Sequence, residues 1–305
     1  MKNKSKSILA SMGMLFTAII WGFAFVVVKD VVSTVSPIYM LAFRFTIASL
    51  GLAIVFFKHF KRLNASTLLH GAVIGFIIFL AYLFQTIGIK YTTAGNNAFL
   101  TTLYVVLVPL ILWIFTKRAP GIHIIVASVL AIIGIGFLSL QDDFFINKGD
   151  WLTILCSLGF ALQMILIALY NQTDDVILLT ILQIFFAAFF SWIVAPFAEG
   201  PIPLTALQEP VALQSILYLG IGSTLIGFLL QNLCQKFVSP PVVAIFLSLE
   251  SLFGVIFAVI FLHEPFTLRM FIGCTLMFVA ILLAETGFTF VPKLKKRKTD
   301  SKTTL

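Results

Sequence analysis

The sequence predicts an all-α integral membrane protein with ten transmembrane helices, arranged as two inverted five-helix repeats. Three observations predict it: the composition, ten apolar runs of spanning length, and a sequence match between the two halves. Of the 305 residues, 60% are hydrophobic and only 10% are charged, and the mean hydropathy is +1.10. Soluble domains contain roughly 45–50% apolar and about 25% charged residues, so the excess apolar surface is expected to face lipid.

Each apolar run is long enough to cross a bilayer, which takes about 20 helical residues. Helices are expected because an open sheet would leave backbone polar groups without partners in lipid. The first run follows the basic segment MKNKSK but is too long for the apolar region of a cleaved signal peptide, so we expect it to remain as the first helix. The runs are 8–28, 37–57, 68–88, 97–115, 122–140, 151–170, 176–196, 214–234, 242–262 and 266–284.

The lysines and arginines fall mostly on one side of this layout, and cytoplasmic loops are the ones that carry such an excess. One side has four: Lys29, Lys90, Lys148 and Arg269. The other side has fifteen: Lys2, Lys4, Lys6, Lys58, Lys61, Arg62, Lys117, Arg118, Lys236, Lys293, Lys295, Lys296, Arg297, Lys298 and Lys302. This predicts a multi-pass protein of the cytoplasmic (inner or plasma) membrane with both termini cytoplasmic. It also explains the net charge of +8 without a nucleic acid partner.

The two halves share an ungapped match at an offset of 146 residues. AYLFQTIGIKYTTAGNNAFLTTLY aligns with GFLLQNLCQKFVSPPVVAIFLSLE, which pairs Gln85 with Gln231 and Tyr104 with Glu250. Because each half has an odd number of helices, the second copy must enter the membrane inverted, which is a transporter architecture. The expected divisions are a cytoplasmic tail over 1–11, repeats over 12–140 and 151–286, and a basic cytoplasmic tail over 287–305.

The ten-helix layout, the segment GNNAFLTTLYVVLVPL, the A-x5-E pattern that ends at Glu250 and the later L-H-E-P resemble the drug/metabolite transporter superfamily, specifically its EamA-type proteins. The resemblance covers roughly 12–286. It implies transport of small metabolites such as amino acids, nucleobases, vitamins or drugs. Many members have proline after the glutamate, whereas Ser251 stands here, so a helix break is expected elsewhere, with Gly254 as the candidate.

Glu250 and Arg44 lie inside apolar runs, where a charged side chain costs roughly 2.5–3.5 kcal/mol on insertion scales. Two interpretations are open for each. Glu250 either binds a substrate amine or a proton, or it braces the fold. Arg44 either binds a substrate carboxylate, forms a structural pair, or extends toward the membrane surface.

Further polar residues complete the predicted substrate site. Asn97, Thr101 and Tyr104 have the i, i+4, i+7 spacing of one helix face, and Pro109 is expected to free the Val105 carbonyl and kink that helix. Trp21, Gln163 and Ser251 are additional site candidates. For Gln85 and Gln231, interhelical hydrogen bonding is the simpler interpretation. The predicted midplane cavity is lined by helices 1, 2, 4, 6, 7 and 9.

The predicted function is secondary transport of a small metabolite, an amino acid or a similar amphipathic solute, across the cytoplasmic membrane by alternating access, with export as a candidate direction. Its partners are that solute and the lipid bilayer, with protons or a counter-substrate as coupling candidates, and the protein is a monomer or homodimer. The alternatives are a membrane-embedded enzyme or a non-transporting scaffold. The sequence contains no H-E-x-x-H or G-x-S-x-G motif and no P-loop. Three widely spaced cysteines in apolar runs suggest neither a disulfide framework nor a metal site, and no cofactor is expected.

Overall fold

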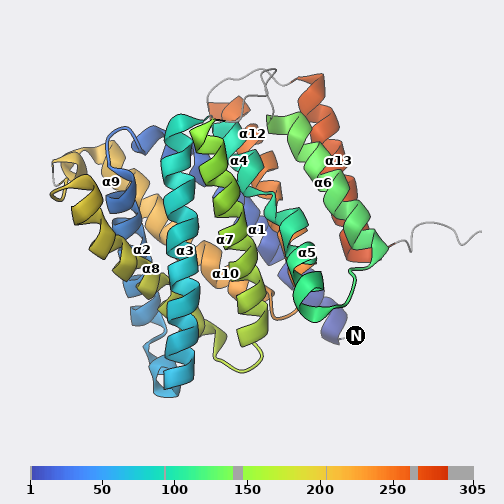
Figure 1. The fold of residues 1–305 in the computed structure, drawn as a ribbon, viewed down its shortest axis with the longest axis horizontal. Coiled ribbons are helices and arrows are strands. Elements are labelled where there is room, and N and C mark those ends of the chain that lie inside the picture. Colours follow the sequence, from blue (N-terminus) through green and yellow to red (C-terminus); the bar gives the residue numbers. More distant parts are fainter. Residues whose placement is uncertain (1, 93, 140–146, 204, 262–266, 288–305) are drawn as a thin grey trace, which may run out of the picture.

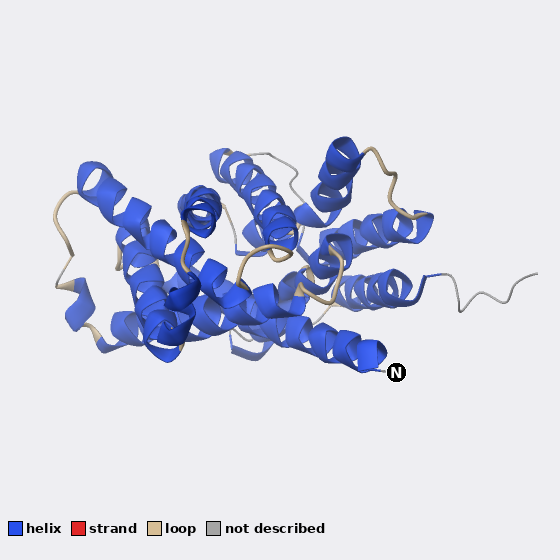
Figure 2. Cartoon of the chain, turned by 90° about the horizontal axis from the view of Figure 1, so that it is seen from below, coloured by secondary structure: helices blue, strands red, loops and turns tan. Residues whose placement is uncertain are grey.

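The computed structural model describes residues 2–92, 94–139, 147–203, 205–261 and 267–287. Over these ranges the chain forms helices joined by short loops, and Figures 1 and 2 show no strand among them. The elements are α1 (Lys2–Val31), α2 (Pro37–Val55), η1 (Phe57–Arg62), α3 (Ala65–Tyr91), α4 (Ala94–Thr101), α5 (Tyr104–Thr116), α6 (Ile122–Ser139), α7 (Lys148–Tyr170), α8 (Val176–Glu199), η2 (Ala206–Gln208), α9 (Pro210–Leu217), η3 (Tyr218–Ile226), α10 (Gly227–Cys234), α11 (Pro240–Leu247), α12 (Leu249–Phe261) and α13 (Leu268–Thr286).

Eight helical segments in the described ranges are long and apolar enough to cross a membrane. The segments are Ile8–Val31, Pro37–Val55, Ala65–Tyr91, Asn97–Thr116, Lys148–Tyr170, Val176–Glu199, Pro210–Cys234 and Pro240–Phe261. Two shorter apolar helices, Ile122–Phe137 and Phe271–Ala284, occupy the places of the expected fifth and tenth spans. The all-helical membrane fold is therefore confirmed, and the count of ten spans stays a prediction.

The helices pack so that segments from the two halves alternate. α3 packs against both α7 and α8, α2 packs against α8, and α1 packs against α12. α6 and α13 pair with each other at one side of the molecule (Figure 1). The halves are thus interleaved rather than adjacent, and a central space can be lined by residues from both.

Gly22 brings the backbones of α1 and α12 into close contact. A Cβ atom at this position would lie 2.8 Å from the Glu250 carbonyl oxygen and 2.9 Å from the Gly254 nitrogen. Only the lack of a side chain permits that approach. The contact holds the start of α12 against the middle of α1, and therefore fixes where the Glu250 side chain enters the interior.

Two acidic residues in the loop between α7 and α8 tie that loop to η1 and the start of α3. Asp174 accepts hydrogen bonds from Thr67 Oγ1 (2.5 Å) and contacts His70 Nδ1 (2.8 Å). Asp175 contacts His59 Nδ1 (2.9 Å) and the Arg62 guanidinium. The loop 171–175 therefore lies at the same end of the molecule as the basic segment 57–62.

Acid is expected to destabilise this end of the protein. Burial alone would raise the pKa of Asp174, but the hydrogen bonds from Thr67 and His70 and the charge of His70 outweigh it and lower that pKa below the ordinary 3.8. A carboxyl with a lowered folded-state pKa contributes stability above its unfolded pKa, and the contribution disappears as pH falls through the folded value. The melting temperature of the detergent-solubilised protein should therefore fall between about pH 5 and pH 3.

The Asp174→Asn variant should melt lower at neutral pH and lose part of this acid dependence. Asp30→Asn is the matched control, because Asp30 is exposed on the structure. A pH profile of Asp174→Asn that matches the wild type in both level and slope would contradict the assignment.

Pro109 lies inside α5 without ending it, and its structural consequence is met by a neighbour. Proline lacks the N–H that would bond the Val105 carbonyl. Ser128 Oγ on α6 donates to that oxygen at 3.1 Å. The Val105 carbonyl that Pro109 leaves without an N–H donor therefore has a partner, and the Ser128 hydrogen bond joins α6 to α5.

Ser128→Ala should lower the free energy of unfolding by about 0.6–1 kcal/mol, because the Val105 carbonyl is left without a donor. Chemical or thermal unfolding in detergent measures the change. Thr275→Ala is the control, since its exposed hydroxyl bonds only the Phe271 carbonyl of its own helix. Equal losses in the two variants would show that the Ser128 bond has no special role.

Candidate substrate site

A central cavity of about 540 Å³ of empty space, including space open to solvent, lies between α1, α2, α3, α4, α5, α7, η3, α10 and α12. Ligand pockets typically have about 300–1,000 Å³, apolar walls and a few polar groups. The lining follows that pattern. It consists of Arg44, Tyr82, Gln85, Asn97, Tyr104, Gln163, Ser223, Gln231 and Glu250 among polar and charged residues and Trp21, Ala24, Phe25, Val28, Ile89, Phe160 and Met164 among largely apolar ones.

The fourth and ninth spans are each broken beside this cavity. α4 ends at Thr101 and α5 begins at Tyr104, while α11 ends at Leu247 and α12 begins at Leu249. The break in the fourth span therefore precedes Pro109. The expectation that Gly254 breaks the ninth span is wrong: Gly254 lies within α12, where it packs against Gly22, and the break falls at Ser248.

The two breaks have the same hydrogen bonds, each related by the offset of 146. The Thr102 hydroxyl donates to the Phe99 carbonyl at 2.8 Å, and the Ser248 hydroxyl donates to the Ile245 carbonyl at 2.8 Å. The backbone N–H three residues after each break residue donates to its carbonyl, at 3.0 Å for Thr102 and 3.2 Å for Ser248. Hydroxyl groups that bond nearby carbonyls compete with regular helical bonding, and both breaks contain such a side chain. Ser157 forms the same bond to the Ile154 carbonyl without interrupting α7, so the breaks also depend on the surrounding packing.

Each break places a candidate site residue at the start of the following helix. Tyr104 begins α5, and Glu250 lies in the first turn of α12. Tyr104 Oη donates to Glu250 Oε1 at 2.9 Å, although 146 residues separate them. Glu250 is only 4% exposed. Its second carboxyl oxygen can accept a hydrogen bond from a cationic group.

Arg44 lies on α2 and is 2% exposed. Its Nε donates to Thr224 Oγ1 at 2.9 Å and its Nη2 donates to Ser223 Oγ at 3.0 Å. The guanidinium also lies over the Tyr82 ring, with Cζ 4.7 Å from the centroid. Within the described residues no carboxylate forms an ion pair with it. Arg44 therefore points inward, contrary to the outward alternative, and carries a buried charge open to an anionic ligand.

The π-helix η3 explains how both hydroxyls reach Arg44. Widened turns of this kind are rare and often occur at functional sites. Thr224 Oγ1 donates to the Leu219 carbonyl five residues earlier, at 2.7 Å. Ser223 and Thr224 are consecutive, and the widened turn presents both toward α2.

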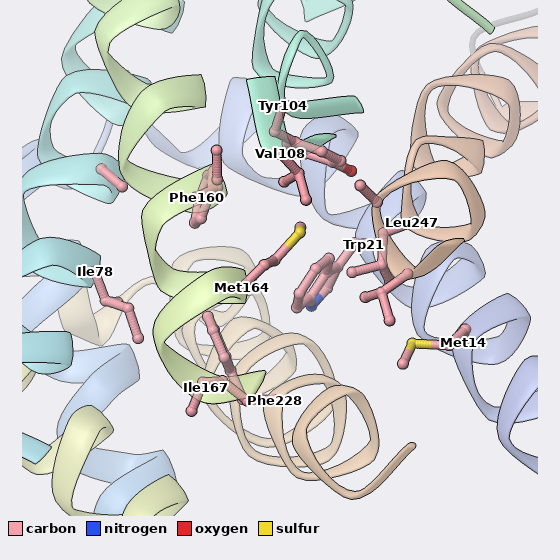
Figure 3. Packing of buried hydrophobic residues seen from close by; sticks show 14 of the residues in the cluster. Met14, Trp21, Ile78, Tyr104, Val108, Phe160, Met164, Ile167, Phe228 and Leu247 are labelled. Atoms are coloured by element: carbon pink, nitrogen blue, oxygen red, sulfur yellow. The ribbon is translucent and has the colours of Figure 1, made fainter. Parts of the chain in front are cut away.

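Aromatic and sulfur-containing side chains form the walls. Trp21 Nε1 donates to the Ser223 carbonyl at 2.8 Å, which fixes the indole ring at the cavity edge. Its ring centroid lies 5.4 Å from that of Phe228. Figure 3 shows Trp21, Met164 and Tyr104 directed toward the same interior region. Trp21 therefore both packs in the core and lines the cavity.

Buried amide side chains supply the remaining polar groups. Asn97 Nδ2 donates to Thr153 Oγ1 at 2.8 Å and to the Gln85 carbonyl at 3.2 Å. Gln231 Nε2 donates to Gln163 Oε1 at 3.0 Å. Asn97 Oδ1, Gln163 Nε2 and Gln231 Oε1 are buried without a hydrogen-bond partner.

Six of the eight sequence-predicted site residues line the cavity, and two do not. Thr101 accepts a hydrogen bond from Gln85 Nε2 at 3.1 Å, and Ser251 Oγ donates to the Ala98 carbonyl at 3.2 Å. The residues that line it are Trp21, Arg44, Asn97, Tyr104, Gln163 and Glu250.

The predicted set of lining helices needs a correction. The third span contributes Tyr82 and Gln85, and the eighth contributes Ser223 and Gln231. The seventh span, α8, contributes none of the lining residues described. It packs behind α2 and α3 instead. The aligned pair Gln85 and Gln231 was the signal in the sequence that could have identified the third and eighth spans as lining helices. No such signal marked Ser223, because its position at the cavity depends on the π-helix η3.

The acidic, histidine and cysteine side chains do not gather elsewhere into a possible metal site: in the described ranges, no three of them lie close enough to hold an ion. His263 and Glu264, in the L-H-E-P pattern, lie outside the described residues. The chemistry available at the cavity is therefore that of Arg44, Glu250, the hydroxyls and the amides.

Comparisons with known proteins agree on one family of transporters. The model of the EamA-like transporter family matches twice, over residues 8–140 and 147–286. An uncharacterized transporter from Archaeoglobus fulgidus is 34% identical over 280 residues, covering 92% of this chain and 87% of that protein. The uncharacterized transporter YvbV from Bacillus subtilis is 24% identical and covers 89% and 90%.

Solved structures share the fold. A crystal structure among them superposes with a TM-score of 0.75 at 14% identity, covering 90% of this chain and 97% of the other. At that identity the likeness concerns the fold alone. The family matches and the transporter relatives carry the assignment: this chain belongs to the EamA-like transporter family of the drug/metabolite transporter superfamily and is a multi-pass membrane transporter.

Proposed function

We propose that this protein is a secondary transporter that moves a small amphipathic solute, such as an amino acid, across the cytoplasmic membrane by alternating access. The observation that carries the proposal is the central cavity, where Arg44 and Glu250 are both buried without an ion-pair partner among the described residues. A buried charge without a counter-charge is costly in a membrane protein and usually functional. A solute with a carboxylate and an amine would compensate both.

The inverted repeat supports the alternating mechanism. A two-fold axis in the membrane plane would produce two equivalent breaks, as at Thr102 and Ser248. It would also bring aligned residues together near the axis, as Tyr104 and Glu250 are. Helices at equivalent positions also pack in pairs, α2 with α8 and α6 with α13. Such repeats allow one half to move against the other around a fixed midplane site. On this basis the two repeats are 12–140 and 151–286. The excess of lysine and arginine supports a cytoplasmic location for the tails 1–11 and 287–305.

Flux into proteoliposomes, measured with a panel of amino acids and related solutes, tests the proposal. Saturable flux of at least one zwitterionic solute is expected, in one or both directions. A proton-coupled carrier should in addition depend on pH between 5 and 8, through the protonatable Glu250. Flux that is absent across the panel would overturn the proposed function, and a flat pH profile would exclude protons as the coupling ion.

A further inference from the structure

The cavity contains an uncharged polar pair in addition to Arg44 and Glu250. Gln163 on α7 and Gln231 on α10 both line the cavity, and both belong to the second half of the chain. They share one hydrogen bond of 3.0 Å. Both side chains are buried, at 1% and 0% exposure.

This single bond leaves one amide NH2 group and one carbonyl oxygen unused. Among the described residues, Gln163 Nε2 and Gln231 Oε1 have no hydrogen-bond partner. The count does not depend on how the two amide groups are oriented. If both were turned around, Gln231 Nε2 and Gln163 Oε1 would be the unused pair, so one NH2 group and one carbonyl oxygen remain in either case.

An unused buried polar group is unfavourable, because it has lost water without gaining a partner. Lipid provides no hydrogen bonds to replace it. A ligand that offers a carbonyl oxygen and an N–H side by side would satisfy both groups together. A carboxylate would satisfy the donor but would place an oxygen lone pair against the glutamine carbonyl. An ester would satisfy the donor alone.

We propose that Gln163 and Gln231 form a subsite that binds a carboxamide group of the transported solute, through one N–H donor and one carbonyl acceptor. The inference rests on the proposed transport function and refines its substrate class. The solute then carries an uncharged amide in addition to the charged groups that Arg44 and Glu250 can bind.

Equilibrium binding to the purified protein in lipid nanodiscs tests the subsite. The probes are L-glutamine, L-glutamate and L-glutamate γ-methyl ester, which share a zwitterionic end and differ only in the side-chain terminus. Glutamine should bind about tenfold more tightly than glutamate and about fivefold more tightly than the ester, the factors expected for one or two unmet hydrogen bonds. Equal affinities, or no binding of any of the three, would overturn the proposal.

Variants locate the preference. Gln231→Met and Gln163→Met keep a side chain of similar length without the amide, and each should bring the three affinities to within about twofold of one another. Gln183→Met is the matched control: Gln183 is equally buried and its amide is also unpartnered, but it lies on α8 and does not line the cavity. It should keep the wild-type preference. Loss of the preference in Gln183→Met alone would place the amide recognition elsewhere.

The binding and flux assays separate this inference from the proposed function. Flux of other zwitterions without a preference for glutamine would overturn the amide subsite and leave the transporter proposal standing. Selective glutamine binding without flux of any solute would support the subsite and overturn transport.

Discussion

Replacing Glu250 with glutamine is expected to reduce solute flux at least tenfold, while the folded protein becomes as stable as the wild type or more stable. Flux should fall because the variant has no carboxylate to bind an amine or a proton. Stability should hold because the glutamine oxygen can still accept the Tyr104 hydrogen bond of 2.9 Å. The variant also removes the cost of burying a carboxylate that is 4% exposed, and replacing a buried charge by a neutral group is often neutral or stabilising.

The pairing of flux with stability distinguishes a binding site from a structural brace. A brace would show the opposite result, with reduced stability and flux close to normal per folded molecule. Tyr104→Phe is the companion variant, because it removes the hydroxyl and leaves the carboxyl in place. It should lose about 1 kcal/mol of unfolding free energy and keep measurable flux. Normal flux in Glu250→Gln would remove Glu250 from the substrate site.

Replacing Arg44 with methionine is the second variant with a large expected effect. It should abolish the flux of carboxylate-bearing solutes and leave the melting temperature in detergent unchanged or raised. Arg44 has hydroxyl partners and the Tyr82 ring but no carboxylate in the described part of the chain. Its burial is therefore only partly compensated, and methionine fills similar space at no electrostatic cost. Thr224 keeps its bond to the Leu219 carbonyl.

A lysine at position 44 provides the matched comparison. It retains the charge but lacks the planar group that bonds Ser223 and Thr224 together and lies over Tyr82. We expect Arg44→Lys to transport with a weaker apparent affinity and a smaller loss of maximal rate than Arg44→Met. If Arg44→Met instead lowers the free energy of unfolding by about 2–3 kcal/mol with normal flux, the guanidinium serves to hold α2 against η3.

Much of the site could be predicted from the sequence because charge and amide groups are rare in apolar runs. Glu250, Arg44, Asn97 and Gln163 all stood out for that reason, and all four line the cavity. Ser251 and Thr101 stood out equally but bond to neighbouring helices. A serine or threonine hydroxyl can hydrogen-bond a nearby backbone carbonyl. Its presence in a span therefore does not indicate that the residue lines a cavity.

The breaks in the fourth and ninth spans were only half predictable. Proline is the usual signal for an interrupted helix. The sequence therefore predicted a kink at Pro109, and the missing proline after Glu250 gave no signal for the break at Ser248. The actual breaks follow Thr101 and Leu247, where the Thr102 and Ser248 hydroxyls bond carbonyls of the preceding turn. The same residues occur without a break in many helices. Their effect here depends on the surrounding packing.

The sequence by itself determined the membrane-spanning helical fold and the most conspicuous buried charges, because a bilayer imposes length and hydrophobicity on every span. The match between the two halves at an offset of 146 residues could also be read from the sequence alone. Only the tertiary structure decided that Tyr104 contacts Glu250, that a π-helix directs Ser223 and Thr224 to Arg44, and that α8 stays behind the cavity. The physical reason is that lipid-facing and cavity-facing positions are both apolar in most of this chain, so hydropathy alone does not reveal which way a helix turns.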